Sequence, residues 1–221
     1  MLITKINLLQ TIHLHNFFIM HILIRASQEQ QNILLNKSIN PNTLITWFTA
    51  DLIDAEAYIE LLFEEEENVF SSIKNKPVIV NALIKNSEDL PINFCRINGW
   101  NTFLEKEKIE AVTFNKDLKP VFENILSELG FQVWFVNDIV GMIAARSVVM
   151  IINEAYFGLQ DEISTKEQIN IAMKLGTNYP FGPFEWAEKI GLKKIALLLQ
   201  ELYITDERYK PSKLLINESL N

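Results

Sequence analysis

Glycine is absent from the first 98 residues of this 221-residue chain, which contains only seven glycines in all. A loop that brings the backbone close to a phosphate needs closely spaced glycines after a strand, so none is expected in this stretch. Histidine is absent after His21, and the rest of the chain therefore offers no imidazole for acid–base catalysis. The single cysteine, Cys95, excludes an internal disulfide, and its apolar context INFCRI predicts a small buried side chain.

Positive charge is also scarce. Lysine and arginine number 20 against 28 acidic residues, which gives a net charge of −8 and a pI near 5.0. Surfaces that bind nucleic acid are basic, so no nucleic-acid partner is expected. No cluster of cysteine and histidine has the spacing of a zinc site, and no metal is predicted. The composition predicts a cytoplasmic protein without a membrane partner.

Residues 1–19 are expected to lie outside the fold. His13, His15 and Asn16 interrupt the apolar residues, and no small-residue cleavage site follows, so the segment is not typical of a signal peptide. It is also too short and too polar for a membrane span. We expect a loosely attached extension that can be disordered.

From Met20 onward, apolar runs of strand length alternate with helical segments. The predicted strands are HILIRA, LITWF, AYIELLF, KPVIVNALI, NFCRING, KIEAVTF and FQVWFVND. SQEQQNILLNKS, EEEENVFSSI and DLKPVFENILSELG are predicted as helices, the last ending at Gly130. This alternation predicts an α/β sheet over residues 20–137. The acidic run Glu64–Glu67 is interpreted as a solvated helix start and not as a metal site.

Residues 138–221 have helical patterns only. IVGMIAARSVVMIINEAYFGL predicts a long helix from Asp138 to about Asp161 with apolar residues on more than one side. STKEQINIAMKLG predicts a helix with Ser164 as N-cap, Glu167 completing a capping box, and Gly176 at the end. The stretch KLGTNYPFGPFEWAEKIGL then concentrates three glycines and two prolines, which indicates a tight turn between two helices.

These helical segments carry a resemblance to a known family. NEA (Asn153–Ala155), AMKLG, YPFGPFEW and DERYKPSKLL follow one another in the order and spacing of the C-terminal helical domain of 3-hydroxyacyl-CoA dehydrogenases. The resemblance implies a fold: a Rossmann-like α/β domain, here without its glycine fingerprint, followed by an all-helical domain. It also implies a homodimer formed through the helical domain.

In that family the α/β domain binds NAD through three glycines after the first strand. The matching positions after HILI are Arg25, Ser27 and Gln30. Side chains at these positions obstruct the tight turn and the approach to pyrophosphate, so no cofactor is expected. Arg25 is expected to be structural or solvent-facing, not a phosphate ligand.

The resemblance also carries the catalytic positions over one by one. Asn101 in GWNTFLE stands where the family has its histidine base, and Glu110 in KIEAV matches the glutamate that orients the histidine. Ala145 in GMIAAR replaces an asparagine, and Leu83 in VNALI replaces a serine. Asparagine cannot accept and release a proton near neutral pH, so the proton-transfer function is lost.

Two hypotheses follow. The first is a catalytically degenerate member of the family, a pseudoenzyme of acyl-CoA metabolism that keeps the fold and a contact surface for acyl-CoA or protein. The second is a working NAD-dependent 3-hydroxyacyl-CoA (3-hydroxybutyryl-CoA) dehydrogenase. The replaced positions favour the first, because function depends on the site and not on the fold.

Overall fold

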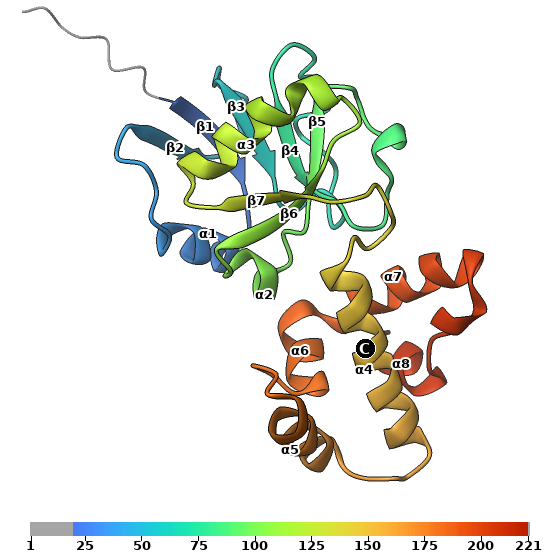
Figure 1. Ribbon diagram of the computed structural model, residues 1–221. Helices are drawn as coiled ribbons and strands as arrows, with labels where there is room; N and C mark the ends of the chain where they lie inside the picture. Colours follow the sequence, from blue (N-terminus) through green and yellow to red (C-terminus); the bar gives the residue numbers. More distant parts are fainter. Residues whose placement is uncertain (1–19, 221) are drawn as a thin grey trace, which may run out of the picture.

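The computed structural model describes residues 20–220. The expected extension of residues 1–19 lies outside the described residues. Within them, an α/β half is followed by a helical half (Figure 1). The predicted fold class, a Rossmann-like α/β region followed by helices, is therefore confirmed.

A single mixed sheet forms the α/β half, with the strand order β2-β1-β3-β4-β5-β6-β7. Neighbouring strands run parallel, except that β5 and β6 are antiparallel. The chain passes from β1 to β2 on one side and then to β3 on the other, so β1 and β3 flank a topological switch point. The strands are β1 (Met20–Arg25), β2 (Thr43–Trp47), β3 (Ala57–Glu60), β4 (Val78–Asn81), β5 (Phe94–Ile97), β6 (Lys108–Val112) and β7 (Gln132–Phe135).

The two faces of the sheet are covered differently. Helices α1 (Gln28–Leu35), α2 (Asn101–Leu104) and α3 (Lys119–Glu128) pack on one face, with the 3₁₀ turn η2 (Lys116–Leu118) leading into α3. The other face is covered by Phe70, Ala55 and neighbouring residues from the segments between strands, where the only helical turn described is η1 (Ser87–Asp89). Alternating residues of each strand supply the two cores, as the period of two in a strand requires.

The short helix predicted for EEEENVFSSI is not present, so the interpretation of Glu64–Glu67 as a helix start is wrong, whereas Glu65, Glu66 and Glu67 are exposed, as expected for a solvated run. The segment forms turns, and three of the four carboxylates find partners within the fold. Glu64 accepts hydrogen bonds from the backbone N–H groups that follow β4, while Glu65 pairs with Lys194 and Glu66 with Arg25. Glu64 binds N–H groups that, among residues 20–220, have no other partner at this edge of the sheet, whereas Glu65 and Glu66 pair with cations at the surface.

The helical half surrounds α4 (Ala144–Gln160), which contacts α6, α7 and α8. The other helices are α5 (Lys166–Thr177), α6 (Pro183–Ile190), α7 (Leu192–Thr205) and α8 (Lys213–Glu218), with a 3₁₀ turn η3 (Glu207–Tyr209) before α8. The helix predicted from Asp138 begins six residues later. Residues 138–141 are held in a turn, because the Gly141 N–H donates to the carbonyl of Leu83 at 2.6 Å and Asp138 pairs with Arg96.

The caps of α5 also differ from the prediction. Thr165, not Ser164, is the N-cap, and its hydroxyl accepts from the Gln168 N–H. The helix continues past Gly176 to Thr177, and Asn178 takes the left-handed conformation at its end, with φ of 55°. Asparagine tolerates this conformation because its short polar side chain lowers the cost.

The glycine- and proline-rich stretch is a packed interhelical turn, as predicted. Gly182 is the N-cap of α6, and a Cβ atom there would lie 2.3 Å from Oδ1 of Asn170. That same Oδ1 accepts the Phe184 N–H at 2.9 Å, and Glu185 accepts the Gly182 N–H at 2.8 Å. The position therefore needs glycine for close approach of α5 to the start of α6.

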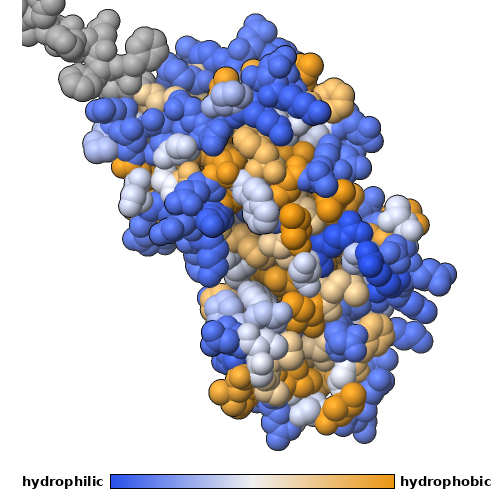
Figure 2. Space-filling model, in the orientation of Figure 1, coloured by the Kyte–Doolittle hydropathy of each residue, from blue (hydrophilic) through white to orange (hydrophobic). Residues whose placement is uncertain are grey.

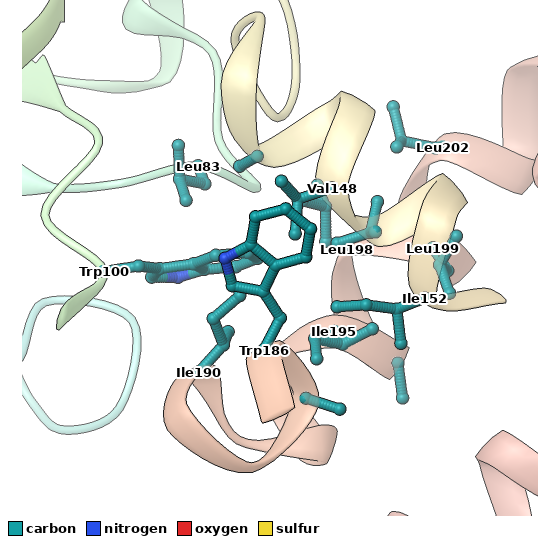
Figure 3. Packing of buried hydrophobic residues seen from close by; sticks show 14 of the residues in the cluster. Leu83, Trp100, Val148, Ile152, Trp186, Ile190, Ile195, Leu198, Leu199 and Leu202 are labelled. Atoms are coloured by element: carbon teal, nitrogen blue, oxygen red, sulfur yellow. The ribbon is translucent and has the colours of Figure 1, made fainter. Parts of the chain in front are cut away.

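A continuous apolar cluster joins the two halves. Leu83 and Trp100 from the α/β half pack with Val148 of α4, Trp186 and Ile190 of α6, and residues of α7 (Figure 3). All of these side chains are buried. The region where the two halves meet is therefore filled largely by apolar side chains.

Candidate active site

The structure places three of the four positions assigned to catalysis, Leu83, Glu110 and Ala145, near the start of α4. Glu110 on β6 accepts the backbone N–H of Ala144 with both carboxylate oxygens, at 3.1 and 3.2 Å. Ala145 and Leu83 are fully buried in the cluster that joins the halves. Asn101 is the first residue of α2, directly after the buried Trp100. The arrangement has one ionisable group among its four members.

Polar oxygens around Asn101 lack partners. Oδ1 of Asn101, Oγ1 of Thr102 and Oδ1 of Asn98 are buried without a hydrogen bond, while the Asn98 amide donates to Glu110 at 3.4 Å. A buried acceptor without a donor loses its hydration and gains nothing in return. An imidazole at position 101 would have an N–H to donate and could exchange a proton. The amide of Asn101 cannot take part in proton transfer.

Glu110 has a structural task in this geometry. Its carboxylate accepts from Ala144, the first residue of the 17-residue helix α4. The first N–H groups of a helix have no partner within the helix, and the helix dipole favours a negative charge at that end. Glu110 therefore caps α4 and ties β6 to the helical half.

Arg25 lies at the switch point of the sheet, at the carboxyl end of β1. Its register partner on β3 is Glu60, and the two side chains form an ion pair at 3.3 Å. Arg25 also pairs with Glu66 and donates to the carbonyl of Glu67 at 2.6 Å. In open α/β sheets this crevice is where a ligand binds, and here the chain's own ion pairs occupy it.

Ser27 and Gln30 close the amino end of α1. The Gln30 N–H donates to the Ser27 hydroxyl at 3.2 Å, and the Ser27 N–H donates to the Gln30 side chain at 2.9 Å, which makes a capping box. Gln30 is buried and also donates to the carbonyl of Leu61 at 3.4 Å. The helix end at which a nucleotide phosphate would bind is thus capped by side chains.

Hydrogen bonds connect Gln30, one of the cofactor positions, to Gly99, which precedes α2. The carbonyl of Leu61 accepts from Gln30 and from the amide of Asn81, and Oδ1 of Asn81 accepts the Gly99 N–H at 2.9 Å. The cavity at this edge measures about 20 Å³ and is lined by Glu64, Glu65, Asn81, Ile84, Trp100, Lys194 and Leu197. That volume holds about one water molecule, whereas pockets for small organic ligands measure roughly 300–1,000 Å³.

Sequence reasoning missed the two buried carboxylates of this edge, Glu60 and Glu64. Burial raises the pKa of both groups, and hydrogen bonds and nearby arginines oppose the shift only in part. Glu64 accepts the N–H groups of Leu83 and Ile84 at 2.8 and 2.6 Å. No local signal marks this role, because the N–H groups lie about twenty residues further along the chain.

Arg96 is a second group that the sequence did not single out. It is fully buried on β5, where it pairs with Asp138 and donates to the carbonyls of Ala82 (3.1 Å) and Ile139 (3.3 Å). Burial lowers its pKa, and Asp138 opposes the change. Cys95 beside it is buried as predicted, and burial raises the pKa of its thiol to about 12, which makes it a poor nucleophile.

The part of the chain that the structure describes has no group of three or more His, Cys, Asp or Glu side chains able to hold a metal ion. In the same residues, no helix is both long and apolar enough to cross a membrane.

Comparisons with known proteins place the helical half in a family. Residues 141–217 match the family model described as 3-hydroxyacyl-CoA dehydrogenase, C-terminal domain. A 3-hydroxyadipyl-CoA dehydrogenase of Escherichia coli K12 is 40% identical over 97 residues, 43% of this chain and 20% of that protein. A 3-hydroxybutyryl-CoA dehydrogenase of Bradyrhizobium diazoefficiens is 28% identical over 185 residues, 75% of this chain and 63% of the relative.

The solved structure of (S)-3-hydroxybutyryl-CoA dehydrogenase from Ralstonia eutropha has the same fold. Its TM-score is 0.69 at 18% identity, with 90% of this chain and 93% of that chain covered. The chain spans between a fifth and just under two thirds of the length of the two curated relatives. Residues 141–217 of the helical half are therefore similar to the C-terminal domain of 3-hydroxyacyl-CoA dehydrogenases.

Proposed function

We propose that this chain is a catalytically degenerate member of the 3-hydroxyacyl-CoA dehydrogenase family that keeps the fold and does not transfer hydride. The observation behind the proposal is the occupied switch point. Arg25 and its carboxylate partners fill the crevice beside β3, and the Ser27–Gln30 capping box closes the end of α1. NAD does not fit these residues, so no chemical step is assigned to it, and binding is expected to be weak or absent.

The residues around Asn101 support the same proposal. The family base is replaced by an amide, and Ala145 and Leu83 present only apolar atoms to the buried cluster. Glu110, the one retained acid, is engaged by the Ala144 N–H. Hydride transfer needs a base, an acceptor and a substrate held together, and none of the three has a place in this arrangement.

The alternative is an active NAD-dependent 3-hydroxybutyryl-CoA dehydrogenase. It is favoured by the names of the relatives and by the retained Glu110. Absorbance of NADH with acetoacetyl-CoA as substrate separates the two hypotheses. We expect no turnover from the wild-type chain or from Asn101→His, because a base contributes about 10² to 10⁴ in rate only when the other groups are in position.

Turnover by the wild-type chain would establish the alternative. Turnover by Asn101→His alone would mean that the cofactor site works, and the degenerate reading would then be wrong. A family dehydrogenase assayed in parallel verifies that the substrates are competent.

We further propose that the chain is a cytoplasmic homodimer that contacts acyl-CoA, with a division into residues 20–137 and 138–221. The division is supported by the last strand, which ends at Phe135, and by the exclusively helical segments after it. The relatives named for CoA thioesters support the ligand class. Ligand-detected NMR with several CoA esters tests that contact, and an absence of line broadening with all of them would refute it.

An apolar groove along α4 supports the dimer. It has a volume of about 500 Å³ and is lined by Met150, Ile151, Glu154, Ala155, Gly158, Ile163, Ile169, Met173 and Pro183. Hydrophobic side chains gather over this part of the molecule (Figure 2). Apolar surfaces of this kind mark interaction sites. Light scattering at high protein concentration tests the proposal, and the mass of a single chain would contradict it.

A further inference from the structure

Two of the four arginines of this acidic chain converge on one hydroxyl group. A cavity of about 240 Å³ lies between the start of α4 and η3, and its lining residues are Arg146, Ser147, Met150, Arg208 and Tyr209. Nε of Arg146 and Nη2 of Arg208 donate to the Tyr209 hydroxyl oxygen at 2.6 and 2.8 Å. Both guanidinium carbons lie 4.8 Å from the centre of the Tyr209 ring.

The charge in this cavity is only partly compensated. Arg25 and Arg96 both pair with carboxylates of the chain, and Arg208 pairs with Asp206 at 2.9 Å. Arg146 has no carboxylate partner among residues 20–220, and the cavity lining contains no acid. Two neighbouring cations repel one another.

The Tyr209 hydroxyl keeps a proton that it can donate. A phenol oxygen has two lone pairs and one proton, and both lone pairs here receive N–H donors from arginines. The proton must then be donated to a third group, and no residue between 20 and 220 accepts it. The hydroxyl lies in the cavity lined by both arginines, so a group bound there can accept this proton.

We propose that this cavity binds an oxyanion, the phosphate or carboxylate group of a small molecule. The terminal N–H groups of Arg146 and Arg208 match such oxygens in a two-pronged geometry, and the Tyr209 hydroxyl donates a further hydrogen bond. An oxyanion removes the repulsion between the two cations at the same time. None of these residues is a candidate catalytic or cofactor position, so the site does not depend on dehydrogenase activity.

The test uses the full chain with inorganic phosphate and, separately, acetate, each against chloride at equal ionic strength. The readouts are the thermal unfolding midpoint and the NMR resonance of the Arg146 Nε–H. We expect both readouts to change and to saturate at millimolar anion concentration. Tighter binding of phosphate or of acetate then shows which kind of oxyanion the cavity prefers. Phosphate also stabilises proteins by exclusion from their surface, so the decisive comparison is between variants.

Arg146→Gln should weaken the saturable binding by about tenfold or more, because it removes a charge-assisted contact. Lys193→Gln is the matched control: it makes the same change in charge at an exposed lysine of α7 and should bind like the wild type. Tyr209→Phe keeps the ring and removes the hydroxyl, so it should also weaken binding. This variant provides the test if Arg146→Gln does not fold.

The proposal is overturned if neither anion gives saturation, or if Arg146→Gln and Lys193→Gln weaken binding equally. It is also overturned if the anions have no effect while Arg146→Gln lowers the mass measured by light scattering. In that case a carboxylate of a second copy occupies the cavity.

Discussion

Polar side chains in the helical half and at the carboxyl edge of the sheet make different kinds of contact. In the helical half they tie helices and turns together: Asn153 of α4 donates to the carbonyl of Lys210 at 2.9 Å and accepts the Ser212 N–H at 2.8 Å. At the carboxyl edge of the sheet, by contrast, Arg25 pairs with Glu60, and Gln30 donates to the carbonyl of Leu61. The comparison teaches that polar side chains stabilise a turn between helices in one half and form a network at the carboxyl edge of the sheet in the other.

The largest expected effect is on a structural residue of the helical half. Asn153→Ala leaves the Lys210 carbonyl and the Ser212 N–H without their partner, and the cost in unfolding free energy is about 2–4 kcal/mol. Urea denaturation measures it. Gln200→Ala, at an exposed position of α7, is the control and should change stability by less than about 0.5 kcal/mol. Equal effects of the two substitutions would show that Asn153 does not tie the turn to α4.

Glu110 connects the two halves, because it lies on β6 and its carboxylate accepts the N–H of Ala144 at the start of α4. Glu110→Ala removes the cap of α4 and should cost about 1–3 kcal/mol, whereas Glu110→Gln keeps an acceptor and should cost less. Chemical denaturation of both variants measures the difference. If Glu110→Ala is as stable as the wild type, the carboxylate does not hold the halves together.

Much of the fold could be predicted, because apolar runs and helix periodicity are local signals. Asp138 and the acidic run at Glu64 were misassigned for a common reason: their partners are distant in sequence. Asp138 pairs with Arg96, and Glu64 binds the N–H groups of Leu83 and Ile84. The cap at Thr165 was missed by one residue, since Ser164 and Thr165 are both good N-caps and only the backbone path decides between them.

The candidate site was less accessible from the sequence. The sequence predicts that Arg25 and Asn101 replace a glycine and the histidine of the family's site. The occupation of the crevice is not visible in the sequence, because Glu60 and Glu66 lie 35 and 41 residues beyond Arg25. Long-range ion pairs have no local pattern, and their presence became evident only from the strand register.

A third prediction concerns pH. Burial raises the pKa of Glu64 from its ordinary value of 4.5, so the folded state binds this proton more tightly than the unfolded state does. The contribution of Glu64 to stability is therefore complete below the unfolded pKa and is lost as the pH rises through the folded pKa. Glu64→Gln keeps an acceptor without the charge, so it should be at least as stable as the wild type near neutral pH.

The effect is measured by thermal unfolding of the wild type and of Glu64→Gln at pH values below and above the folded-state pKa of Glu64. Glu60 shifts in the same direction, and Glu185 and Glu218 in the opposite one, so the informative quantity is the difference between the two proteins at each pH. A difference that does not change with pH would contradict the burial of an ionised Glu64.

The smallest effect is expected beside Asn101. The Thr102 hydroxyl is buried without a partner, so Thr102→Val should be neutral or should stabilise by up to about 1 kcal/mol. The unfolding midpoint in urea measures it. A loss of more than about 1 kcal/mol would mean that the hydroxyl has a partner, such as an ordered water, and that the site is more than a remnant.

The central claim is that the chain's own side chains have taken the place of NAD, and calorimetric titration with NAD tests it most directly. The wild-type chain should give no saturable heat at concentrations that saturate a family dehydrogenase measured beside it. The variant with Arg25, Ser27 and Gln30 all changed to glycine shows whether removing these side chains is enough to restore binding. A dissociation constant in the low micromolar range for the wild-type chain would contradict the account.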